Sequence, residues 1–457
     1  MASIIENCWS RNLAGKPWLL AVAGLVAFIS TGTPHPAFAG AFLNDIQSTG
    51  AASVSTAGQT AIAEDAATVY YNPAGMTLLD GPQILVSSGF VLISTSFENK
   101  GTTAPLGDPA HGSTGAKDQI FPVPSLFATA PLSDRLSVGL GLFSPFGQAN
   151  KYASDWVGRY QLQSISLKTI DIDPTIAYRV NDAFSLGAGL DIQYAHLKRK
   201  NAIDFGAFCF AVIGPANCSG RGLLPQSQDG QLGVDTEDWS VGFNLSALYN
   251  IGEMTHIGLN YRSAVHHDFS GDADFTVPAA AGLLTASGLF QDTSVHTTMT
   301  FPELIALGLS QRIDESFTLL ADVDWTRWSR VKQVTFNFGN PIQPPQSLVL
   351  NWKDSIRVAV GGIYRLTENT DLRAGISFDQ SPVTDAFRSA DLPDSDQIMF
   401  STGLTHRFDQ QFSAVISYSF GHFMAAPVNL PQQNAGTLAG TFQRNSHALG
   451  LQGRLLL

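Results

Sequence analysis

The chain has 457 residues, and its charge content narrows the class of protein before any motif is considered. Charged residues make up 14% of it, against about 25% in a typical soluble protein. Mean hydropathy is slightly positive at +0.07. No long apolar run follows residue 30, which excludes a helical membrane protein and favours a membrane protein made of strands. The net charge of −12 argues against nucleic acid as a partner.

Residues 1–39 have the features of a secretory signal peptide. Arg11 and Lys16 form a positively charged region before an apolar stretch at 17–30. This stretch is too short to span a bilayer. Residues 37–39 (Ala-Phe-Ala) then provide a cleavage site before Gly40. We therefore expect residues 1–39 to be removed on export.

Residues 40–82 form a segment without strand-like alternation. Small residues between 51 and 71 suit closely packed helices, while Asn72 suits an N-cap and Pro73 the first helical position. The segment could be a periplasmic extension or a plug inside a barrel. We expect a plug, because the first strand begins near Ile84 without a linker or a charge-rich surface before it.

Residues 83–457 alternate between apolar and small or polar side chains, which predicts strands. The clearest runs are 184–194, 317–326 and 412–421, each about the length of a strand that crosses a bilayer at a tilt. The chain ends in leucines rather than an aromatic residue, but Leu449, Leu451, Leu455 and Leu457 still alternate as a lipid-facing strand. Since a sheet that spans a membrane must pair all its backbone groups, it must close into a barrel.

Six short polar turns separate the predicted strands and alternate with longer, irregular segments. This asymmetry is typical of outer-membrane barrels, with the short turns in the periplasm. Adding the two terminal strands gives fourteen antiparallel strands. Tyr178, Tyr249 and Tyr364 each lie four residues before the acidic residue of a short turn, as expected of an aromatic girdle at the periplasmic interface. The turns are at 133–135, 181–182, 252–253, 314–315, 367–369 and 409–410.

The predicted third strand, which begins at Leu136, loses its alternation after Phe143. Ser144, Pro145, Phe146 and Gly147 follow, and proline cannot donate to a strand ladder. One interpretation is a kink that leaves a gap in the barrel wall. The other is that the strand ends at Phe143 and Pro145 opens a loop.

Two long outer segments contain apolar residues where polar ones are usual. One carries Phe208 and Phe210 beside Cys209 and Cys218, and the other, at 277–290, carries Leu283 and Leu284. Exposed apolar clusters often mark a binding surface, although these could also pack on each other as a lid. In an oxidising compartment the two cysteines could form a disulfide or remain free thiols.

Several motifs resemble the FadL family of outer-membrane transporters for long-chain fatty acids and related hydrophobic compounds. Residues 40–42 (Gly-Ala-Phe), 63–66 (Ala-Glu-Asp-Ala) and Asn72-Pro73-Ala74 are similar to its N-terminal hatch. Further similar blocks lie at 301–304 with 325–329, and at 375–383 with 388–389 and 392–396. The resemblance covers the mature chain in the expected order.

The resemblance implies a fourteen-stranded barrel whose lumen is closed by the hatch. It also implies ligand-gated, passive uptake that ends with lateral exit at a kink in the third strand, here at 144–147. The mature N-terminal tip should reach an inner pocket, which assigns Phe42 and Leu43 to ligand contact. We expect a monomer in the outer membrane, in contact with its lipid.

A fatty acid carboxylate would suit a cation in the inner pocket. Arg159, Lys198, Arg357 and Arg388 are the candidates, although Arg357 could instead be a structural charge paired with a carboxylate such as Asp379. The residues show no catalytic, metal-binding or cofactor-binding constellation. The alternatives are uptake of monoaromatic hydrocarbons, an outer-membrane hydrolase, and a general porin or adhesin.

Overall fold

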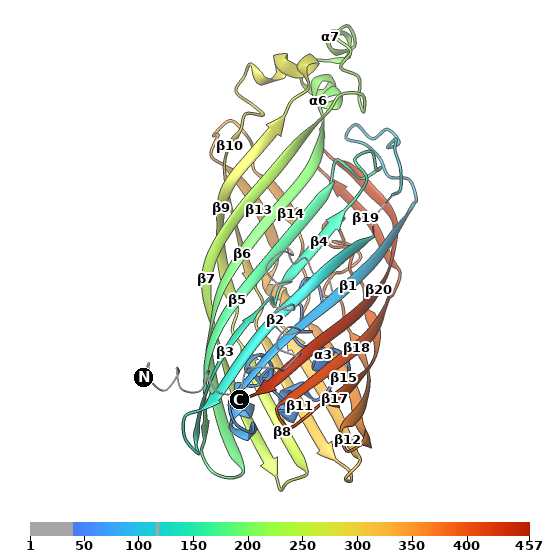
Figure 1. Cartoon of the computed structure of the whole chain (residues 1–457). Coiled ribbons are helices and arrows are strands. Elements are labelled where there is room, and N and C mark those ends of the chain that lie inside the picture. The colour runs from blue at the N-terminus through green and yellow to red at the C-terminus, as the bar shows by residue number, and fades with distance from the viewer. Residues whose placement is uncertain (1–39, 116–117) are drawn as a thin grey trace, which may run out of the picture.

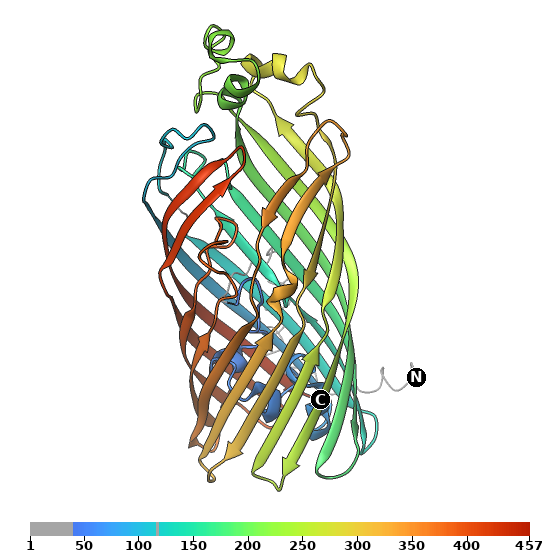
Figure 2. The same cartoon turned by 180° about the vertical axis from the view of Figure 1, so that it is seen from behind.

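The structure, a computed structural model, describes residues 40–115 and 118–457; the predicted signal peptide lies outside this range. Its main feature is a tall, closed antiparallel barrel of fourteen strands. The strands are tilted relative to the barrel axis, and helices lie inside the lower half of the barrel (Figures 1 and 2). The strand segments are β1 (Gln83–Asn99), β2 (Gln119–Pro131), β3 (Leu136–Phe143), β4 (Gly147–Lys151), β5 (Ser164–Arg179), β6 (Phe184–Asp204), β7 (Asp229–Ile251), β8 (Thr255–Arg262), β9 (Val265–Thr276), β10 (Thr293–Phe301), β11 (Leu304–Arg312), β12 (Phe317–Thr326), β13 (Gln333–Phe338), β14 (Gln346–Val349), β15 (Ser355–Thr367), β16 (Thr370–Asp379), β17 (Gln397–Arg407), β18 (Phe412–Phe423), β19 (Ala426–Gln432) and β20 (Gly436–Leu456).

Six of the fourteen spanning strands are interrupted and therefore appear as two segments each. These are β3 with β4, β8 with β9, β10 with β11, β12 with β13, β14 with β15, and β18 with β19. The barrel closes where β1 pairs with β20, from Gln83 opposite Leu456 to Asn99 opposite Gly440. The predicted strand number and all six short turns are confirmed.

The alternation of the sequence decides which side chains face lipid. On β7 the odd-numbered residues from Trp239 to Ile251 point outward, and most of them are large and apolar. Tyr178, Tyr249 and Tyr364 are also exposed on the outer surface, close to the short turns. An apolar outer belt with aromatic residues at its edge is what a lipid-facing barrel surface requires.

The segment before β1 lies inside the barrel, where almost all of it is buried. We call residues 40–82 the hatch; its four short helices pack against the inner faces of β8, β11, β18 and other strands. Asn72 caps the last helix by accepting a hydrogen bond from the Ala74 N–H, and Pro73 takes the first helical position. The helices are α3 (Thr49–Ala52), α4 (Gln59–Ile62), α5 (Thr68–Tyr71) and the 3-10 helix η1 (Pro73–Leu78).

Glycines in the barrel wall make room for the hatch backbone. A Cβ at Gly258 would collide with the Thr60 carbonyl, and one at Gly375 with the Val54 carbonyl. This close approach explains why glycine stands on the lumen side of strands that otherwise carry bulky outer residues.

The long loops at the other end of the barrel carry further short helices. These are α6 (Phe205–Val212), α7 (Pro215–Ser219) and the 3-10 helix η2 (Ala279–Thr285), which form the highest part of the molecule in Figure 1, while η3 (Trp328–Arg330) lies between β12 and β13. Within the described ranges, none of the helices has the length and apolar character needed to cross a membrane.

Candidate functional site: a closed path through the barrel

An aromatic cage surrounds the N-terminal tip of the hatch. Phe42 is 2% exposed, and its ring centroid lies 4.7 Å from that of Trp328, 5.3 Å from Phe301, 5.7 Å from Trp352 and 5.8 Å from Phe146. These partners come from β10, η3 and the segments around residues 146 and 352, so strands from several parts of the chain converge on one ring. Leu43, the next residue, packs against the same apolar cluster.

The third spanning strand breaks beside this cage. β3 ends at Phe143 and β4 begins at Gly147, so strand structure resumes after Pro145. β2 pairs with β3 only from Leu126 to Pro131, and β4 pairs with β5. In the described part of the chain no ladder joins β2 to β4, which leaves the wall without backbone pairing above the break.

The tip of the hatch occupies the inner side of this break. The Asn44 N–H donates to the Pro145 carbonyl at 2.7 Å, and the Gly147 N–H donates to the Phe42 carbonyl at 2.8 Å. Leu43 and Phe146 thereby form an antiparallel bridge. Backbone groups that the broken strand cannot pair with its neighbour are instead paired with the hatch.

Arginines on the barrel wall hold the body of the hatch. Arg262 Nη2 donates to the Tyr70 carbonyl at 3.2 Å, Arg373 Nη1 donates to Glu64 at 2.9 Å, and Arg357 donates to the Ser55 carbonyl. All three arginines are buried and come from β8, β15 and β16. Arg179 and Arg454 add bonds to the Thr77 and Glu64 carbonyls.

The four cations that the sequence offers as head-group partners all have carboxylate partners. Lys198 also lies on the outer wall rather than in the lumen, because it is exposed on the same face of β6 as Leu190. Arg357 is paired, as one interpretation of the sequence expected, although with other carboxylates than Asp379. The pairs are Arg159 with Asp229 at 2.7 Å, Arg357 with Asp45 at 3.0 Å and Asp324 at 2.9 Å, Arg388 with Asp385 at 2.5 Å, and Lys198 with Asp235 at 2.6 Å.

A different arginine, for which no sequence motif predicted a head-group contact, faces the lumen without hydrogen bonds. Arg444 on β20 is 2% exposed, and among the described residues its Nε, Nη1 and Nη2 have no hydrogen-bond partner. Its Nη1 lies 3.9 Å from Asp394 Oδ1, and its Cζ lies 4.7 Å from the centre of the Phe423 ring. A buried cation with unused donors is costly, so this position suits a further anionic group.

Asp394 connects Arg444 to the hatch tip. Its Oδ2 accepts hydrogen bonds from the Ala41 N–H at 3.3 Å and from the Ser381 hydroxyl at 2.7 Å. Burial raises the pKa of this carboxyl to about 6. An anion that binds Arg444 would therefore approach a carboxylate that itself contacts the tip.

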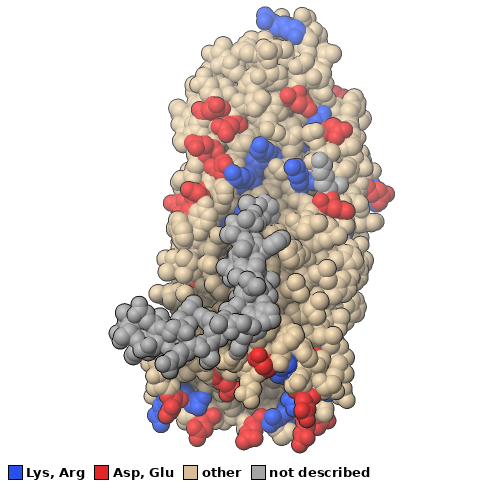
Figure 3. All heavy atoms as spheres, viewed as in Figure 1, with Lys and Arg blue, Asp and Glu red and all other residues tan. Residues whose placement is uncertain are grey.

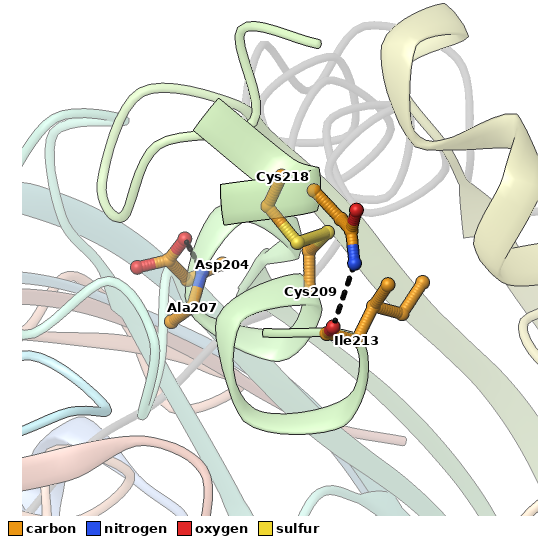
Figure 4. Close-up of a disulfide and its surroundings, with 6 residues drawn as sticks. Asp204, Ala207, Cys209, Ile213 and Cys218 are labelled. Atoms are coloured by element: carbon orange, nitrogen blue, oxygen red, sulfur yellow. Dashed lines mark hydrogen bonds between the residues drawn. A yellow bond between two sulfur atoms is a disulfide. The ribbon is translucent and has the colours of Figure 1, made fainter. Parts of the chain in front are cut away.

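The apolar residues of the outer loops pack on one another at the barrel mouth. Phe208 lies 5.0 Å from Phe290 between ring centroids, and Leu284 is buried in the same cluster, with Phe210 and Leu283 packed against it. A disulfide joins Cys209 of α6 to Cys218 of α7, and Asp204 caps α6 by accepting from the Ala207 N–H (Figure 4). This loop cluster stands above the upper ends of β6, β7 and β9 (Figures 1 and 2).

A small cavity lies between the hatch and the barrel wall formed by β1, β2, β18 and β20. It is lined by Ile46, Ala52, Val91 and Leu449, among others, and has a volume of about 20 Å³. This is room for about one water molecule. This cavity is too small for an acyl chain.

Comparisons with known proteins agree with this architecture. Residues 28–455 match the family model of outer membrane transport proteins described as OMPP1/FadL/TodX. A long-chain fatty acid transport protein of Escherichia coli O157:H7 is 30% identical over 438 residues, which cover 90% of this chain and 93% of the relative. The crystal structure of a Pseudomonas aeruginosa FadL homologue has a TM-score of 0.82 at 20% identity and covers 91% of this chain and 99% of its own. The toluene transporter TbuX of Ralstonia pickettii has a TM-score of 0.61 at 17% identity, with 90% and 99% covered.

Proposed function

The chain belongs to the OMPP1/FadL/TodX family of outer membrane transport proteins, and we propose that it takes up long-chain fatty acids across the outer membrane. The family and the barrel place it in that membrane as a transporter of hydrophobic compounds. The observation that carries the choice of ligand is Arg444, a buried guanidinium with unused donors beside an apolar lumen. An amphiphile with an anionic head and a long apolar tail satisfies both features.

A neutral monoaromatic ligand suits this site less well. Toluene or a similar arene would fill apolar space but would leave the Arg444 donors unpaired. The relatives described as long-chain fatty acid transport proteins are also about 30% identical over most of the chain. Both points favour the carboxylate ligand.

The proposed route has three steps. The ligand is collected by the loop cluster at the mouth and enters the lumen, where its carboxylate binds Arg444. Binding weakens the contact between Asp394 and Ala41, so that the tip around Phe42 withdraws from the break. The tail then leaves sideways between β2 and β4 into the membrane. Gating here requires only that the ligand binds the open arrangement better than the closed one.

Uptake of radiolabelled oleate by a transporter-deficient strain that expresses the chain tests the proposal. We expect uptake above that of empty vector, and an Arg444→Met variant should reduce it about tenfold or more, since a hydrogen bond to a charged group contributes about 1.5–3 kcal/mol. Arg135→Met, in an exposed turn, is the matched control and should transport like the wild type. Oleyl alcohol and toluene serve as uncharged comparison ligands.

Two results would contradict the proposal. One is the absence of oleate uptake when the barrel is present in the outer membrane. The other is an Arg444→Met variant that lowers the uptake of oleate and of toluene equally, because a head-group contact should affect only the anion. Toluene uptake without oleate uptake would favour the monoaromatic branch of the family.

A further inference from the structure

The outer wall of the barrel carries a concentration of lysines on three adjacent strand segments. Of nine lysines in the chain, seven lie in the described ranges, and four of these are on β4, β5 and β6. Figure 3 shows the corresponding group of basic residues on the upper half of this face, with acidic residues gathered beside it. We define the lysine patch as Lys151, Lys168, Lys198 and Lys200.

Strand register places the whole patch on the lipid side of the wall. Lys168 continues the outward series of Ile170, Ile172 and Ile176 on β5. Lys198 and Lys200 continue the outward series of Leu186 and Leu190 on β6. Lys151 pairs with Ser164, and Ser164 in turn pairs with Lys200, so these three residues share one face.

The same register gives the height of the patch relative to the membrane. Tyr194 and Trp239 are opposite each other, with ring centroids 5.2 Å apart, and the lipid-facing residues lie below them. Such aromatic residues mark the membrane–water interface. Lys168, paired with His196, occupies the next outward row, and Lys198 and Lys200 occupy the two rows above that. Two residues along a strand span roughly 7 Å. The lowest lysine of the patch, Lys168, therefore lies about that distance above the row of Tyr194.

Most of this charge is not neutralised by the protein. Lys198 pairs with Asp235 on β7 at 2.6 Å. For the ammonium groups of Lys151, Lys168 and Lys200, the described residues offer no carboxylate within ion-pair distance. The acidic side chains begin at β7. Asp235 and Glu237 line a depression of about 720 Å³ together with Lys198 of β6 and residues of β9. The unpaired lysines thus lie on β4, β5 and β6, whereas the neighbouring acidic residues begin on β7.

We propose that the lysine patch binds the phosphate groups of the outer-leaflet glycolipid, the lipid A part of lipopolysaccharide. At this height on the outer surface, the groups that a barrel meets are the head groups of that leaflet, and lipid A carries its phosphates there. Lysines at a membrane surface attract anionic head groups by charge, and ammonium groups bind phosphate as point charges without a fixed geometry. The bound glycolipid would lie against β4 and β5, beside the break through which the proposed ligand leaves.

Binding of lipid A to the purified, delipidated full-length mature protein, followed by native mass spectrometry, tests the inference. The test variant combines Lys151→Gln, Lys168→Gln and Lys200→Gln. We expect it to bind bisphosphorylated lipid A about tenfold or more weakly than the wild type. A variant with arginine at the same three positions should bind like the wild type, because it keeps the charge.

A matched control removes the same charge elsewhere, with Lys332→Gln, Lys353→Gln and Arg135→Gln, all at exposed positions. It should bind lipid A like the wild type. Heat-dependent mobility on gels establishes that each variant is a folded barrel. If the glutamine variant does not fold, lipid A from which the phosphates have been removed provides the same comparison on the wild type.

Three results would overturn the inference. They are equal lipid A binding by the wild type and the glutamine variant, equal binding of phosphorylated and dephosphorylated lipid A by the wild type, and displacement of lipid A by inorganic phosphate at the same concentration. The last would indicate a site for small anions instead of a glycolipid site. Oleate uptake is measured separately, so failure here does not bear on the proposed ligand.

Discussion

At the scale of single residues, the charges inside the barrel divide into two kinds. Arg262, Arg357 and Arg373 are committed to the hatch and to wall carboxylates. Arg444 is not, since Asp394 faces it at 3.9 Å without a hydrogen bond. The structural arginines and the arginine that we propose binds the ligand thus differ in how many of their donors the protein itself uses.

The pair of Arg444 and Asp394 predicts how anion binding depends on pH. Asp394 lies between β16 and β17, and its pKa is raised to about 6 by burial. It is mostly ionised at pH 7 and competes with a ligand anion, and mostly neutral at pH 5, where the competition is lost. Dodecyl sulfate, which stays ionised throughout, should bind more tightly as the pH falls from 7 to 5.

This pH dependence can be measured by titration calorimetry below the critical micelle concentration. An Asp394→Asn variant is expected to bind dodecyl sulfate with little change over the same range, because it has no proton to take up at this position. Tighter binding at pH 7 than at pH 5 in the wild type would contradict the assignment of Arg444 and Asp394 as a competing pair.

Replacement of Arg262 is expected to lower the stability of the barrel without changing its ligand selectivity. It forms ion pairs with Asp173 and Asp191, both buried, and its loss would leave these carboxylates uncompensated. An Arg262→Met variant should lose about 3–5 kcal/mol of unfolding free energy, measured by urea unfolding in detergent. Arg135→Met is the control; an Arg262→Met barrel as stable as the wild type would rule out this role.

At the scale of elements, the break between β3 and β4 is the feature with the clearest mechanical consequence. The wall above it lacks backbone pairing between β2 and β4, and the hatch tip supplies partners instead. A gap of this kind can open without breaking the strand ladders that hold the barrel closed. Opening requires that the tip moves and that the apolar side chains of β2 and β4 separate.

Covalent closure of this part of the wall tests lateral exit. Val123 of β2 and Ala149 of β4 lie in one buried apolar cluster, so a variant with cysteine at both positions should form a bond across the gap. Its oleate uptake should fall to the empty-vector level when oxidised and recover on reduction. The two single-cysteine variants, treated in the same way, control for the native disulfide; full uptake by the cross-linked protein would exclude exit between β2 and β4.

The sequence predicted the elements well because period-two alternation reports directly on two faces of a strand. Runs such as 184–194 and the six short turns were sufficient for the strand number. The side-chain partners of Arg159 and Arg388 were beyond reach, because both arginines lie in irregular segments between strands, which no periodic pattern places. The inward position of Arg444 could have been predicted. The odd-numbered leucines from Leu449 to Leu457 face lipid, so the even-numbered residues of the same strand, including Arg444, face the lumen.

At the scale of the whole molecule, the hatch makes the barrel a closed body. Its helices lie in the lower lumen (Figure 2) and contact strands around most of the circumference. Without such a plug, a barrel of fourteen strands would enclose a water-filled channel lined by polar side chains, as a porin does. Steady ion flow is therefore not expected of this chain.

Planar bilayer recordings test whether the hatch prevents steady ion flow. The wild type should show no steady conductance. A variant with Arg357→Met and Arg373→Met, which removes two attachments of the hatch, should show frequent openings, with Arg135→Met again as the control. Constant conductance of the wild type would instead favour a general porin.

The closure of the barrel also dictates the order in which the chain can assemble. The hatch directly precedes β1, and β1 finds β20 across 17 residues at the far end of the sequence. Hairpins between neighbouring strands can form early, but this last pairing joins segments that are most distant along the chain. Once it has formed, helices of this size have no way in through a paired wall. We therefore expect the hatch to be enclosed while the sheet is still open, and mutations that delay its compaction should slow the final pairing more than the hairpins.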